Sequence, residues 1–118
     1  MDKNLRAKWL NELRNTKTVQ CLGFLRQNDE RDALGILLDL SDLGSWHQTD
    51  QNPYYDENCW FYEDGPLTLE YPPSYTVPNS RLRNKLGLTL AEQEMVMAMN
   101  DSGRGFAEIA DQVSKYIL

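Results

Sequence analysis

Apolar residues recur at the spacing of an amphipathic helix in five stretches of the chain. Among them, residues 30–43 are the most apolar, with Leu34, Leu37 and Leu38 on one wide face, so we expect this helix to be central. The five predicted helices lie near 3–14, 30–43, 80–86, 90–99 and 105–117. Their inward-facing residues predict a core that includes Trp9, Leu13, Leu34, Leu37, Leu38, Val96, Phe106, Ile109 and Val113.

Polar residues and glycines mark where these helices begin and end. For the helix at 30–43, Asn28 or Asp29 is the expected N-cap and Gly44 the expected end. Within that helix Gly35 costs about 1 kcal/mol relative to Ala, so we expect it to admit a closely packed neighbour. The other predicted caps are Asp2 or Asn4, Asn79 or Ser80, Gly87, and the pair Thr89 and Glu92 as a capping box.

Strand patterns are short and confined to the middle of the chain. "CWFYE" and "LTLEY" flank Asp64-Gly65 and predict a hairpin over 59–71, although Pro66 weakens it. Residues 45–58 have no period and predict a long acidic surface loop. "TKTVQCLGFLRQ" predicts a short strand or an extended link. The sum is an α+β fold: a mainly helical single domain over 1–118, with about five helices and a small antiparallel β-hairpin.

Charge is distributed unevenly along the chain. Residues 1–31 carry seven bases and four acids, residues 81–118 five of each, and residues 32–80 nine acids and no Lys or Arg, which together give −6. The central segment repels phosphate and favours a partner with a basic surface. The alternative is a solvated acidic face that only aids solubility.

The acidic segment also contains eight of the twelve aromatic residues. Neighbours on a strand point to opposite faces, so a hairpin packed on helices buries one face and exposes aromatics on the other. We expect a partner-binding surface with Trp60 or Tyr62 as a buried anchor and acids as a steering rim; in the alternative, the long loop covers these residues. The candidate binding residues are Trp46, Tyr54, Tyr55, Asp56, Glu57, Trp60, Tyr62, Glu63 and Asp64.

The segment "LTLAEQEMVMAMNDSGRGFAEIADQV" resembles the start of the helix-turn-helix of response regulators and sigma factors. Only "SKYIL" follows it, which is too short for a recognition helix, and the segment has no excess of basic residues. We therefore expect no specific DNA binding, and a helical pair that packs Phe106 and Ile109 into the core.

Catalytic and metal-binding patterns are weak. His47 has Ser45 and Asp50 near it in sequence, which does not make a triad, and Cys21 and Cys59 are expected to be small buried hydrophobic residues. Scattered Cys and His are too few for zinc, and Tyr54 and Tyr55 interrupt a calcium-loop pattern. We expect no enzyme activity, no metal and no cofactor. The longest apolar run is far too short to span a membrane, and the few cysteines with no signal peptide indicate a reducing, intracellular location.

Across nearly its whole length the chain resembles a group of small uncharacterised proteins of tailed phages and prophages. The residues that carry the resemblance are Leu5-Arg6, Trp9, Leu13-Arg14, Gln20, Gly23, Leu25-Arg26, "ALGILLDL", "LGL" at 86–88 and "MNDSGRGFAEIAD". Where the group often has Cys-Cys, this chain has Asp32-Ala33, so a thiol or metal role of that pair cannot operate here. The resemblance implies phage origin and action in the cytoplasm of an infected bacterium, and supplies no catalytic residue.

These observations favour a non-enzymatic phage accessory protein that binds a host protein through an acidic, aromatic face. Inhibition of a bacterial defence or regulatory system is one use of such binding. Two alternatives stay open. A binder of a small molecule such as a nucleotide signal would draw cations from Arg6, Arg14, Arg26 and Arg31, or from Arg81, Arg83 and Lys85. A nucleic-acid mimic would use the acidic face. The sequence predicts no oligomeric state.

Overall fold

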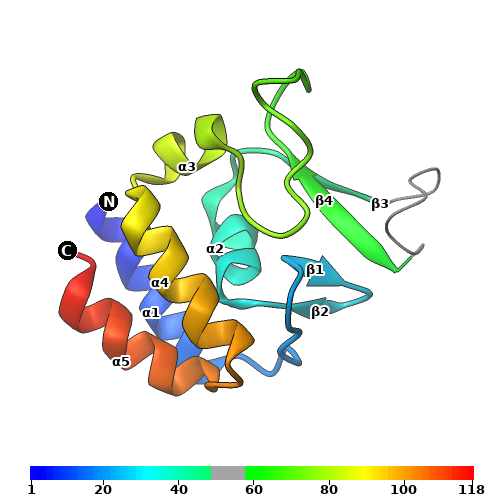
Figure 1. Cartoon of the computed structure of the whole chain (residues 1–118). Coiled ribbons are helices and arrows are strands. Elements are labelled where there is room, and N and C mark those ends of the chain that lie inside the picture. The colour runs from blue at the N-terminus through cyan, green and yellow to red at the C-terminus, as the bar shows by residue number, and fades with distance from the viewer. Residues whose placement is uncertain (49–57) are drawn as a thin grey trace.

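A computed structural model describes residues 1–48 and 58–118, and shows the predicted α+β architecture (Figure 1). Helices α1, α4 and α5 gather on one side, α2 lies at the centre, and a small antiparallel sheet lies on the other side. The elements in chain order are α1 (Lys3–Asn15), β1 (Arg26–Gln27), β2 (Glu30–Arg31), α2 (Ala33–Ser41), β3 (Ser45–Gln48), β4 (Cys59–Glu63), α3 (Ser80–Leu86), α4 (Leu90–Asp101) and α5 (Phe106–Tyr116).

Most helix ends follow the predicted caps. The Asp2 carboxylate accepts a hydrogen bond from Leu5 N–H at the start of α1, and Asn79 caps α3 in the same way. Gly87 ends α3 with φ +76°, in the left-handed region that suits glycine. Thr89 and Glu92 form the predicted capping box at the start of α4.

The central helix α2 is shorter than the predicted 30–43. Glu30 and Arg31 pair with β1 as strand β2, so the helix begins only at Ala33, and its N-cap is Asp32 rather than Asn28 or Asp29. Its end is Asp42, at φ +54°, instead of Gly44. Gly44 lies against the backbone of β4, where an added Cβ would be 1.9 Å from the Glu63 carbonyl oxygen.

The predicted hairpin over 59–71 is wrong. Strand β4 is central in a four-stranded sheet of order β2-β1-β4-β3, and its neighbours are β1 and β3. Beyond its pairing with β1, β4 bonds to Ser74 rather than to 67–71: Tyr62 N–H donates to the Ser74 carbonyl oxygen at 3.1 Å. The prolines around 67–71 also lack the N–H that a strand needs. Strand β3 (Ser45–Gln48) also corrects the prediction of a loop over 45–58; the rest of that loop, 49–57, lies outside the described residues.

The core lies between α1, α2, α4 and α5, with α3 and the sheet closing its sides. Trp9 is fully buried, and its indole N–H donates to the carbonyl oxygen of Ala33 at 2.9 Å. All the predicted core residues are buried except Phe106. Phe106 is only half-buried because it is the first residue of α5, at the edge of the core.

A buried polar junction joins α4 to the segment before β1. The Asn100 amide donates to the Cys21 carbonyl oxygen and accepts from Ala33 N–H and from the Gln20 amide. Next to it, the Asp101 carboxylate accepts from Gly23 N–H at 2.9 Å. The segment that resembles a helix-turn-helix therefore contributes Asn100 to the interior of this fold and Asp101 to an exposed contact with Gly23. Helix α5 buries its apolar face against α1 and α4.

Both cysteines are buried, as predicted, and they form no disulfide with each other. The Cys21 thiol donates to the carbonyl oxygen of Phe24 at 3.2 Å. Burial, followed by the nearby Asp32, raises the pKa of Cys21 to about 12. This cysteine is therefore a protonated, unreactive thiol at neutral pH.

Candidate protein-binding surface

Arginines from the basic first third of the chain lie on the aromatic face of the sheet. The strand register places Arg26 opposite both Arg31 and Trp60, and Trp46 opposite Tyr62, so these residues share one face. The Arg26 guanidinium lies 3.8 Å from the ring centroid of Trp60 and 5.7 Å from that of Trp46. Arg31 lies 5.4 Å from the Trp46 ring. These are cation–π distances, so the arginines hold both tryptophans in place.

Asp39, on helix α2, binds two residues of this face. The Asp39 carboxylate accepts from the indole N–H of Trp46 at 2.7 Å and from Arg31 Nε at 3.0 Å. Tyr62 packs edge-to-face against Trp46, with ring centroids 5.1 Å apart. Its hydroxyl accepts from Gly44 N–H at 2.7 Å. Because Tyr62 is buried in the core, the prediction that it is a partner-binding anchor is wrong. Trp46 and Trp60 are only half-buried.

The opposite face of the sheet carries a second aromatic group. The rings of His47 and Phe61 stack at 5.4 Å, and Tyr75 lies 5.3 Å from Phe61. His47 Nε2 is 3.1 Å from Ser45 Oγ and 3.3 Å from a carboxylate oxygen of Glu63. A catalytic triad needs the serine and the acid on different ring nitrogens, whereas here both meet Nε2. The Ser45–His47–Glu63 group is therefore a surface contact between β3 and β4 rather than a triad.

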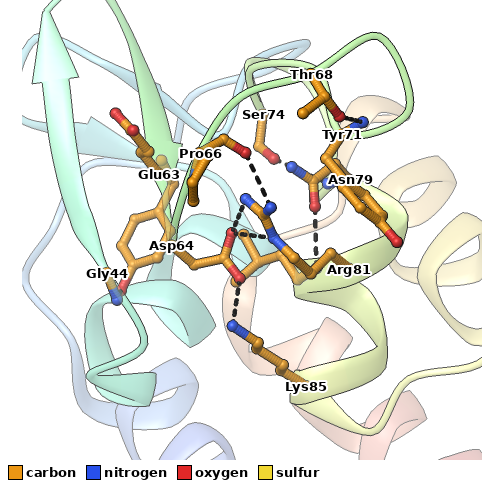
Figure 2. Close-up of polar contacts among 12 residues, drawn as sticks. Gly44, Glu63, Asp64, Pro66, Thr68, Tyr71, Ser74, Asn79, Arg81 and Lys85 are labelled. Carbon is orange, nitrogen blue, oxygen red and sulfur yellow. Dashed lines mark hydrogen bonds and ion pairs between the residues drawn. The ribbon is translucent and has the colours of Figure 1, made fainter.

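Asp64 directly follows the last residue of β4 and pairs with two side chains of α3. Arg81 donates to Asp64 Oδ1 from Nε at 3.2 Å and from Nη2 at 3.0 Å, and Lys85 Nζ lies 3.0 Å from Oδ2 (Figure 2). The Asp64 side chain is completely buried. Burial alone would raise the pKa of Asp64, but its hydrogen bonds and ion pairs with Arg81 and Lys85 outweigh it and leave the pKa below its ordinary value. The prediction that Asp64 belongs to an exposed acidic rim is wrong, because the fold uses it internally.

Two of the six described acids of the central segment pair with Arg or Lys within the chain: Asp39 with Arg31, and Asp64 with Arg81 and Lys85. Glu63 lies beside His47, a contact that is ionic only if the histidine is protonated. Glu63 stays partly exposed beside His47. Four candidate residues, Tyr54, Tyr55, Asp56 and Glu57, lie outside the described residues.

Sequence reasoning missed the part that Arg26 and Arg31 play in this surface. The signal available in the sequence was weak: they are the last bases before a long segment that has none. Arg26 meets Trp60 through the antiparallel pairing of β1 with β4, a pairing that the sequence prediction did not include.

No family model, curated protein or solved structure matches this chain. The resemblance to phage proteins therefore stays a prediction. In the part of the chain that the structure describes, none of the helices is long and apolar enough to cross a membrane.

Proposed function

We propose that this protein is a non-enzymatic phage accessory protein that binds a protein of the bacterial host through the aromatic sheet surface. We define this surface by Trp46 and Trp60, which share one face of the sheet, and propose that it acts in the host cytoplasm. Glu63, predicted as part of the acidic rim, lies on the opposite face beside His47, so that part of the prediction is wrong. The observation that carries the proposal is the pair of half-buried tryptophans held by Arg26. Because the rings are already ordered, binding loses little side-chain entropy, and tryptophan is common among residues that dominate binding energy.

Charge favours a host partner with a basic surface. The chain carries −6, and residues 49–57 contribute Asp50, Asp56 and Glu57 without any Lys or Arg. Such charges raise the association rate with a basic surface and make that rate depend on salt. Interference with a bacterial defence or regulatory system is the use that we propose for this binding.

The contacts of the arginines in the first third of the chain weigh against a nucleotide site built from them. Arg6 donates to the carbonyl oxygens of Ile117 and Ser114. Arg14 pairs with Asp111, while Arg26 and Arg31 lie on the tryptophans. These cations are therefore already used by the fold. The pairing of Asp39 and Asp64 with the chain's own Arg and Lys side chains likewise weighs against nucleic-acid mimicry.

The test begins with affinity purification from host cells followed by mass spectrometry. The recovered protein is then purified, and its dissociation from the wild type is compared with that from Trp60→Ala. Loss of a buried aromatic anchor is expected to weaken binding by about 2 kcal/mol, mostly through faster release.

The matched control is Tyr116→Ala, which removes an exposed aromatic side chain from α5 and should bind as the wild type does. Thermal melting must show that both variants are folded. If Trp60→Ala binds as tightly as the wild type, the aromatic sheet surface is not the contact site.

A further inference from the structure

The loop between β4 and α3 exposes leucines although its own backbone is firmly held. Figure 1 shows this loop rising away from the helical body beside α3. Leu69 is as exposed as in an extended peptide, at 104%, and Leu67 is 39% exposed. Single exposed leucines are ordinary on a protein surface. What distinguishes these two is the set of contacts that holds the loop beneath them.

Arg81 is the main support of this loop. While two of its nitrogens bind Asp64, its Nη1 donates to the carbonyl oxygen of Pro66 at 2.9 Å (Figure 2). Its guanidinium also lies 4.8 Å from the ring centroid of Tyr71. One side chain from α3 therefore contacts both the start and the end of the stretch that carries the leucines.

Further hydrogen bonds close the loop on itself and on α3. Thr68 N–H donates to the Tyr71 carbonyl oxygen at 3.1 Å, and Tyr71 N–H donates to the Thr68 hydroxyl at 2.9 Å. The Asn79 amide donates to the carbonyl oxygen of Pro72 at 3.0 Å. Pro66, Pro72 and Pro73 restrict the backbone still more. The leucines are therefore presented on an ordered loop, and docking through them would require little further ordering.

The charge beside the leucines selects among possible occupants. Asp64 is neutralised by Arg81 and Lys85, while Glu70, next to Leu69, is exposed. A lone exposed carboxylate beside an apolar tip complements an apolar pocket with a basic group at its rim. The same carboxylate, on a chain of net charge −6, disfavours insertion into an anionic membrane.

We propose that the loop over 65–73 is a second contact element for the host protein, in which Leu69 enters an apolar pocket and Glu70 meets a basic group at the rim. This inference rests on the proposed function and adds the chemistry of the partner's pocket to it.

The test places a photocrosslinking amino acid at position 69 or, as a control, at position 90 in host cells. Leu90 is also an exposed leucine, 51% exposed, but lies at the start of α4. We expect a host protein to crosslink from position 69 and not from position 90. Binding of that purified protein is then measured with Leu69→Ser, Glu70→Lys, Leu90→Ser and Trp60→Ala.

We expect Leu69→Ser to weaken binding about tenfold or more, and Glu70→Lys to slow association at low salt. Leu90→Ser should match the wild type. Unchanged binding by Leu69→Ser together with weaker binding by Trp60→Ala would overturn the inference and leave the proposed function standing. Recovery of no host protein by the wild type would overturn both.

Two other possible binding partners of the loop, a membrane and a second copy of the chain, are tested with the same variants. Vesicles of phosphatidylethanolamine and phosphatidylglycerol are the membrane probe, and the size of the purified chain at increasing concentration tests for a second copy. Vesicle binding or self-association that disappears in Leu69→Ser, without a host crosslink from position 69, would overturn the inference.

Discussion

Asp32 caps α2 from a position that solvent hardly reaches. Its side chain accepts from Gly35 N–H at 2.7 Å, and the residue is only 1% exposed. Burial is the largest influence on its pKa and raises it; the hydrogen bond from Gly35 lowers it, and the nearby Asp101 raises it again. The result is a shift of the pKa from 3.8 to about 8. The folded protein therefore keeps a proton on Asp32 at pH values where the unfolded chain has lost it.

The free energy of unfolding should fall as the pH rises from about 4 to about 8, because the unfolded state binds fewer protons there. Asp32→Asn keeps a capping oxygen and cannot ionise, so its stability should change less over this range and exceed that of the wild type near the upper end. Urea unfolding at a series of pH values measures the free energy of unfolding of the wild type and of Asp32→Asn. Asp42→Asn, at an exposed acid, is the control and should follow the wild type. Parallel curves for Asp32→Asn and the wild type would contradict the assignment.

At the scale of elements, α2 and the segment leading into β1 approach each other closely at Gly35. An added Cβ at Gly35 would lie 2.0 Å from the carbonyl oxygen of Leu25. That same carbonyl accepts from Asp32 N–H at 3.2 Å, so it cannot move without disturbing the start of the helix. This close packing is what Gly35 was expected to permit.

The substitution Gly35→Ala has two opposite effects on stability: a higher helix propensity and a steric clash. Alanine would stabilise the isolated helix by about 1 kcal/mol. The clash with the Leu25 backbone should outweigh this gain, so that the free energy of unfolding falls by roughly 1–3 kcal/mol, as measured by chemical denaturation. Gly105→Ala makes the same chemical change where nothing lies within 4 Å, and it should cost less than about 1 kcal/mol. A Gly35→Ala variant as stable as the wild type would mean that α2 can move away from Leu25.

At the scale of the whole molecule, folding mixes charges that are separate along the chain. Bases from the first third, Arg26 and Arg31, and from α3, Arg81 and Lys85, cover acidic and aromatic groups of the central segment. Helix α5, the counterpart of a second helix-turn-helix element, buries Ile109, Ala110 and Val113 in the core. Its apolar face is therefore used by the fold.

We predict that the protein does not bind duplex DNA specifically. In a gel shift at ~150 mM salt, binding should be no tighter than the 10⁻⁴–10⁻⁶ M that is usual for non-specific contact. The reason is the net charge of −6 together with the internal use of Arg6, Arg14, Arg26 and Arg31. A sequence-specific shift at nanomolar protein would contradict this prediction.

The helices could be predicted from the sequence, because their apolar spacing and caps are local properties. Asp2, Asn79, Gly87 and the Thr89–Glu92 box all lie where the pattern placed them. The sheet could not be predicted in the same way. Strands β1 and β2 have two residues each, too few for any period, and β4 pairs with β1 across a long stretch of sequence.

The candidate surface, too, could be predicted from the sequence only in part. The sequence by itself determined that aromatic and acidic residues are concentrated between 46 and 75, and that strand alternation separates Trp60 from Phe61. Only the tertiary structure decided that Tyr62 and Asp64 are internal, that Arg26 holds two tryptophans, and that the predicted second strand is instead a loop exposing Leu69. The physical reason is that burial and ion pairing depend on which segments meet in space, and pairing between distant strands leaves no periodic trace in either of them.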